Sequence, residues 1–268
     1  MKLLALIAAL LGCLARQSPA DGPEPLTSDR PGFTDTVNVL PSGLLQLESG
    51  VNLSDASNSA SKIRVLASGN PLIRMGWGHR IELRYGGAGY ETSLLESHGT
   101  STRCAGMSDF AVGMKLALTG EHGWRPSVSL ESMVSLPVGA AAFTSAGADP
   151  TFKLAWSKSL SATLAASGNF NVSSLSTPFG RYTQRAVTAR LDRGVWRKLA
   201  GFVDTMMTAP VSPGGSTTWM MAAGLEHPLG SNAQLDLSVG QQAVPIAHCW
   251  FVGAGVVFRQ PLWHGQRK

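Results

Sequence analysis

Alternating apolar and polar residues run through most of the chain, and the alternation is clearest between residues 44 and 53. The two sets there are Leu45, Leu47, Val51 and Leu53 on one side, and Gln46, Glu48, Gly50 and Asn52 on the other. Side chains of a β-strand alternate between its two faces, so this period of two predicts a strand with one apolar and one polar face. Residues 28–43 lack the period, and we expect them to form an irregular lead-in to this strand.

The same pattern recurs along the rest of the chain and predicts twelve strands. They cover residues 44–53, 63–75, 81–85, 109–118, 127–136, 152–156, 163–172, 187–191, 199–207, 218–226, 234–239 and 250–259. Proline is poor in a central strand, so we expect a bulge or kink at Pro71 in the second one. Connections after odd-numbered strands are the longer ones, and residues 91–106 and 137–149 are expected to be long loops.

An even number of strands with long and short connections in alternation is typical of an outer-membrane barrel. The predicted fold is therefore all-β, an antiparallel up-and-down transmembrane β-barrel of about 12 strands over residues 44–268. A water-soluble β-sandwich is the alternative, but it would rarely carry charges so regularly on one strand face. Aromatic residues near the strand ends fit interfacial girdles: Trp77, Tyr85, Tyr90, Trp124, Trp156, Trp196, Trp219 and Trp250.

The first 20 residues predict an export signal. Lys2 precedes an apolar run at residues 3–14, and small residues ending at Ala20 form a plausible cleavage site. The residues before and including Cys13 also fit a lipoprotein cleavage box, which would lipidate that cysteine. Both interpretations, and a buried N-terminal helix, stay open at this point. Export by either route, together with the predicted barrel, places the protein in the bacterial outer membrane.

Net charge adds little to this picture. It is +5 for the whole chain, and it falls to +3 without residues 1–20, which contain Lys2, Arg16 and no acid. The basic residues are scattered, so nucleic acid is not an expected partner. Cys104 and Cys249 are the cysteines of the exported chain, and the sequence leaves open whether they form a disulfide or stay free.

The polar face of the strands is predicted to line the lumen, because a charge on the lipid face near the midplane costs about 2–4 kcal/mol. Such a mixed ring either braces the barrel or lines a path for a solute. The predicted lumen-lining residues are Glu48, Glu82, Arg84, Asp109, Lys115, Glu131, Lys153, Arg190, Asp204, Glu226, Asp236 and Arg259.

Residues 21–43 are expected to be a periplasmic lead-in or a partial plug. Their charged side chains cannot face lipid, so the segment belongs at the periplasmic mouth or inside it. The alternative is a turn that anchors the first strand to the last. The gate or plug candidates are Asp29, Arg30, Pro31, Phe33 and Asp35.

No catalytic set stands out. The six histidines are dispersed, no metal-ligand spacing is found, and no Gly-x-Ser-x-Gly motif occurs. The His and Ser pair of the outer-membrane phospholipases is not found either. We therefore expect no enzyme activity, no cofactor and no metal.

Several motifs together resemble the family of the MetA pathway of phenol degradation. The opening DRPGFTD and the later LPSG and LLQLESG resemble the family's start, and HRIELRYG, SDFAVGMKLAL, VSLPVG and FVGAGVVFR resemble later segments. The matching residues of the first motif are Asp29, Arg30, Pro31, Phe33, Thr34, Pro41, Gly43, Gln46, Leu47, Glu48, Ser49 and Gly50. The chain departs from the family pattern at residues 199–207. The resemblance implies an outer-membrane barrel that passes aromatic or other small hydrophobic compounds.

These observations predict an outer-membrane channel or passive transporter for small molecules, with membrane lipid and a small solute as its partners. The polar lumen favours amphipathic solutes over purely hydrophobic ones. The alternative is a closed structural or adhesive barrel whose long loops make contacts outside, and a barrel enzyme is a third. The sequence leaves the oligomeric state open.

Overall fold

The computed structural model of the chain describes residues 25–196, 198–244 and 248–262. The predicted signal segment and Cys13 lie outside these residues. No helix in the described ranges is long and apolar enough to cross a membrane. The described chain instead forms strands β1 Leu44–Ser57, β2 Ser61–Trp77, β3 Ile81–Gly87, β4 Gly89–Ser97, β5 Thr100–Met107, β6 Phe110–Thr119, β7 Ser127–Leu136, β8 Asp149–Ser159, β9 Leu164–Thr177, β10 Gly180–Trp196, β11 Leu199–Ala209, β12 Thr218–Pro228, β13 Ala233–Gln242 and β14 His248–Pro261.

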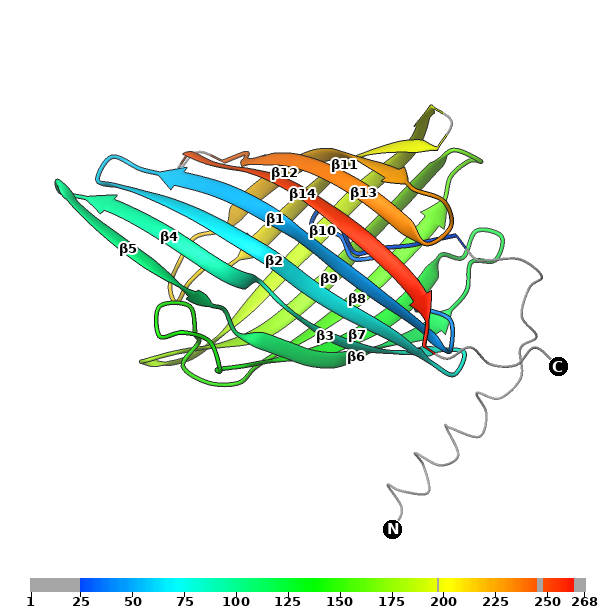
Figure 1. Cartoon of the computed structure of the whole chain (residues 1–268), viewed down its shortest axis with the longest axis horizontal. Helices are drawn as coiled ribbons and strands as arrows, with labels where there is room; N and C mark the ends of the chain where they lie inside the picture. The colour runs from blue at the N-terminus through cyan, green and yellow to red at the C-terminus, as the bar shows by residue number, and fades with distance from the viewer. Residues whose placement is uncertain (1–24, 197, 245–247, 263–268) are drawn as a thin grey trace, which may run out of the picture.

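The strands close into a single antiparallel barrel, because β1 pairs with β2 on one side and with β14 on the other (Figure 1). β3 and β4 pair with successive halves of β2 and together make one long wall strand. β5 and β6 make the next one in the same way, since β5 pairs with β4 and β6 with β3. The fourteen segments therefore form twelve wall strands, which confirms the predicted all-β barrel.

One predicted loop is wrong. Residues 91–106 belong to the hairpin of β4 and β5, which Figure 1 shows extending from one end of the barrel. Its turn is at His98 and Gly99, which have φ of 49° and 77° as the two central residues of a tight hairpin turn. The Ser and Thr residues that suggested a loop lie on strands here, where the backbone pairs with β2 and β-branched Thr is well tolerated.

The kink expected near Pro71 lies just before it, at Gly69 and Asn70, both of which have positive φ. At this point β2 changes its partner from β4 to β3, and the pairing with β1 shifts between Glu48 and Gly50. The interruption therefore runs across several neighbouring strands. It divides this side of the wall into a part where β2 pairs with β4 and a part where it pairs with β3.

The distribution of burial is inverted relative to a water-soluble protein. On β13, Gln234, Asp236 and Ser238 are buried, whereas the intervening Leu235 and Leu237 are 47% and 58% exposed. The largest fully buried side chains are mostly charged or polar, and large apolar side chains cover the outside. This arrangement, with apolar side chains outside and polar ones inside, is typical of transmembrane β-barrels.

Cys104 and Cys249 are both free thiols. They lie on β5 and β14, and three strands (β4, β2 and β1) separate these two strands in the sheet order. The disulfide that the sequence left open is therefore not formed.

We predict that Leu237→Arg destabilises the barrel in a lipid bilayer by about 2–4 kcal/mol, because it places a charge on the lipid face near the middle of β13. Val195→Arg near the end of β10 is the matched control, with an expected cost of about 0–1 kcal/mol. Denaturant unfolding in liposomes, followed by tryptophan fluorescence, measures both. Equal losses for the two variants would contradict the assignment of Leu237 to the membrane midplane.

Candidate functional site

The lead-in segment, residues 25–43, lies inside the barrel. Figure 1 shows its dark blue trace among the strands, and its contacts reach wall strands on every side. Its residues bond to β1 through Glu48, to β8 through Lys153, to β11 through Asp204 and to β13 through Asp236. The segment therefore crosses the lumen.

Wall carboxylates accept hydrogen bonds from the main chain of this segment. Glu48 accepts the N–H groups of Asp29 and Arg30 at 3.0 and 3.1 Å from its Oε2. Asp204 accepts those of Phe33 and Thr34 at 2.7 and 3.0 Å. Further along the segment, the N–H of Leu40 donates to Oε2 of Glu82 at 2.8 Å. These carboxylates replace the partners that a strand or helix would have supplied.

Wall cations bind the carbonyl groups of the same segment. Arg74 donates to the carbonyls of Thr27 and Asn38 at 2.9 and 3.0 Å, and Lys115 donates to that of Thr36 at 2.8 Å. On the other side of the lumen, Nη1 of Arg190 donates to the carbonyl of Pro31. Carboxylates for N–H groups and cations for carbonyls together hold an irregular chain that has few hydrogen bonds of its own.

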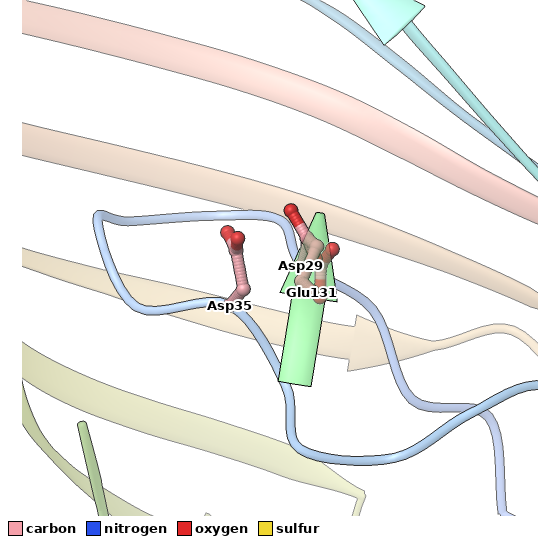
Figure 2. A group of neighbouring side chains, drawn as sticks. All are labelled: Asp29, Asp35 and Glu131. Atoms are coloured by element: carbon pink, nitrogen blue, oxygen red, sulfur yellow. The ribbon is translucent and has the colours of Figure 1, made fainter. Parts of the chain in front are cut away.

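Three carboxylates converge where the segment meets β7, as Figure 2 shows. Asp29 and Asp35 come from the lead-in and Glu131 from the strand, and oxygen atoms of all three lie within 4.8 Å of one another. Three cations surround them: Arg84 and Lys115 pair with Asp29 and Glu131, and Lys153 pairs with Asp35 and Glu131. The cations already balance the charge that would otherwise favour a metal ion.

Arg74 contacts four residues of the interior, and sequence reasoning missed it. Its side chain is fully buried and lies between Glu48 and Glu82, at 3.0 and 2.8 Å. Glu82 in turn accepts from Arg84 at 2.8 Å. The alternation could have identified it, because Arg74 lies between the apolar Ile73 and Met75 and therefore belongs to the polar face of the strand.

A second cluster lies at β10 to β12. Arg190 pairs with Asp192 at 2.7 Å and with Glu226, and its guanidinium lies 3.9 Å from the ring centroid of Phe202. Neutral residues that the sequence analysis did not predict extend this cluster. The hydroxyl of Thr34 in the lead-in donates a hydrogen bond to the hydroxyl of Thr188, which donates to Oδ1 of Asn169.

Arg30 reaches the wall at a place without side chains. A Cβ added to Gly255 of β14 would come within 2.3 Å of the Arg30 guanidinium, and one added to the paired Gly50 of β1 would come equally close. The two glycines give Arg30 room to pair with Asp236 at 3.3 Å.

Eleven of the twelve predicted lumen residues make the interior contacts with the lead-in or with one another. Arg259 is among them, since it donates to the carbonyls of Pro25 and Ser231. Asp109 lies apart, just before β6, where it accepts hydrogen bonds from Gly139 and Ser145 and holds the 137–148 connection. The five lead-in candidates lie within the same interior.

The comparisons with known proteins agree with this geometry. The family model described as "Putative MetA-pathway of phenol degradation" matches residues 28–242. The chain belongs to this family. The match begins at the lead-in motif and confirms the resemblance drawn from the sequence. A search of curated proteins finds no match.

Solved structures of outer-membrane barrels share the fold. The COG4313 outer membrane channel from Pseudomonas putida F1 is 12% identical, with a TM-score of 0.60 over 83% of this chain and 97% of that one. The translocator domain of autotransporter NalP from Neisseria meningitidis is 10% identical, with a TM-score of 0.53 over 84% and 91%. The NanC porin is 12% identical, with a TM-score of 0.51 over 79% and 98%.

We predict that Arg74→Met destabilises the barrel by about 3–5 kcal/mol, because it leaves two buried carboxylates without their cation. Arg64→Met is the matched control. Arg64 pairs with Asp55 at 3.1 Å, but its side chain is 49% exposed, and the expected cost is about 0–1 kcal/mol. Denaturant unfolding in detergent micelles compares the two variants. A loss for Arg74→Met no larger than that for Arg64→Met would contradict the central role of this residue.

Proposed function

We propose that the protein is a passive channel of the bacterial outer membrane for small amphipathic or aromatic solutes, and that its lead-in segment is a plug. The observation that carries the proposal is a segment without regular structure that crosses the lumen. It is attached to the wall by hydrogen bonds and ion pairs and continues directly into β1.

The location follows from the wall. Its exterior is apolar and its interior is polar, which is the arrangement of barrels that span an outer membrane. The solved barrels that the chain resembles include an outer-membrane channel and a porin, and the family description points to phenol degradation. A periplasmic lead-in that folds back into the barrel is consistent with both.

The nature of the solute follows from the charge pattern. Cations and carboxylates alternate around the lead-in and are paired with one another, so the interior offers no large field of one sign. Such an interior favours neutral solutes with both polar and apolar surface over strongly charged ones. Asp204 is the carboxylate of this interior that is held by hydrogen bonds from Phe33 and Thr34 in place of an ion pair.

The anchors of the plug differ in burial. Arg74 and its partner Glu48 are fully buried, whereas the Arg30 side chain that pairs with Asp236 is 17% exposed, so release of the segment would begin at Arg30. The glycine pair that receives Arg30 makes one anchor depend on the absence of a side chain.

We predict that deleting residues 28–36 raises single-channel conductance in planar bilayers several-fold, because it removes the part of the segment that crosses the lumen. Deleting residues 95–102 at the tip of the β4–β5 hairpin is the control and should leave conductance unchanged. Liposome uptake of a small neutral sugar provides the second readout.

A milder variant covers the case in which the deletion prevents folding. Gly255→Ala displaces the Arg30 guanidinium, breaks its pair with Asp236 and should increase the frequency of openings. Absence of conductance and uptake in the wild type and in every folded variant would rule out the channel. Conductance that is equal in the wild type and the 28–36 deletion would rule out the plug.

A further inference from the structure

One side of the lumen is not filled by the ion-pair network. A cavity of about 280 Å³ lies between the turn at residues 29–33 of the lead-in and the wall formed by β12, β13, β14 and β1. Drug-sized sites occupy roughly 300–1,000 Å³, so this cavity suits a smaller molecule. The residues that line it include Phe33, Phe251, Met220, Cys249, Asn52 and Ser238.

The apolar side of the cavity comes from both the plug and the wall. Phe33 of the lead-in and Phe251 of β14 meet edge to face, with ring centroids 5.7 Å apart and an interplanar angle of 70°. Met220 and Cys249 add two polarisable sulfur atoms. Aromatic rings favour further rings in edge-to-face or offset contact, and thioether sulfur also packs well against them. This part of the cavity therefore suits a planar ring.

The polar side of the cavity offers an unused acceptor. The Oδ1 atom of Asn52 is buried and has no hydrogen-bond partner among the described residues. Ser238 lies nearby, because a Cβ added to Gly253 would come within 3.0 Å of its Oγ and 4.0 Å of the Asn52 Cγ. Buried polar atoms without a partner are rare, and a donor on a bound molecule would complete this one.

The charged groups at the rim favour a neutral ligand. Asp29 and Arg30 border the cavity, but Asp29 pairs with Arg84 and Lys115, and Arg30 pairs with Asp236. A charged ligand would have to replace one of these partners, whereas a neutral one leaves them in place.

We propose that this cavity is a solute-binding site for small neutral ring compounds that carry one hydrogen-bond donor. The ring packs against Phe33 and Phe251, and the donor reaches Asn52. This proposal rests on the proposed channel function. The cavity lies between the plug and the wall, where a solute that passes the plug would be held. Since Phe33 belongs to the lead-in, a bound ring contacts the plug and the wall at once.

Equilibrium binding tests the site without any transport. Phenol is the probe, because it is a small neutral ring with a single hydroxyl, and toluene and benzoate are its counterparts without a donor and with a charge. The full chain in detergent micelles is titrated with each compound by calorimetry, against micelles alone. Phenol should bind saturably, and toluene and benzoate about tenfold more weakly, as expected for one lost hydrogen bond or an unpaired charge.

Variants separate the two halves of the site. Asn52→Leu should weaken phenol about tenfold and leave toluene unchanged, since it removes the acceptor alone. Phe251→Ala should weaken the binding of both phenol and toluene. Phe251→Leu replaces it if the alanine variant does not fold. Phe170→Ala is the matched control: Phe170 is 52% exposed on the outer wall, so its loss should change neither affinity.

Three outcomes decide the matter. Saturable phenol binding that survives unchanged in Asn52→Leu and in the Phe251 variants would overturn the site. Absence of saturable binding in a wild-type protein that conducts would also overturn it and leave the channel intact. Binding that follows the expected pattern in a protein without conductance would support the site while the channel function fails.

Discussion

The contact between wall charges and the main chain of the lead-in is the interaction on which the rest of the interior depends. A barrel with an apolar exterior must direct its polar side chains inward, and each of them then needs a partner in a confined space. An irregular segment inside the same space has unpaired N–H and carbonyl groups. In this protein each set satisfies the other: Glu48, Glu82 and Asp204 accept from the segment, and Arg74, Lys115 and Arg190 donate to it.

This arrangement makes the interior uneven. Ion pairs are dense from β1 to β8, where Arg74 and Glu131 each join several partners and little space remains. From β12 to β14 the network thins, and a cavity with two phenylalanine rings takes its place. Charged pairs hold a segment in one geometry, whereas an apolar-lined cavity accepts different small molecules. The two sides of the lumen are therefore suited to anchoring the segment and to receiving a solute.

The hairpin of β4 and β5 shows where the alternation is insufficient. Its residues do not alternate, since Leu94 and Leu95 are adjacent and Ser and Thr follow one another at residues 100–102, because it extends beyond the region where one face must meet lipid and the other the lumen. A segment that meets water on both sides loses the period of two, although its backbone still pairs with β2. The wall strands kept the period because their two faces meet different surroundings.

The sequence by itself determined the barrel, the number of its wall strands and the inward direction of its charged face, since all three follow from a period of two. The lengths of connections were a poorer guide, because the connections after β1, β4 and β9, expected to be long, are turns at residues 58–60, 98–99 and 178–179. The sequence also placed Asp29, Arg30 and Asp35 away from lipid. Tertiary structure alone decided which groups meet across the lumen, such as Phe33 with Phe251 or Asp35 with Lys153. The physical reason is that alternation fixes the face of each side chain, whereas distances across a closed ring depend on the strand register, the kink at Gly69 and the path of the lead-in.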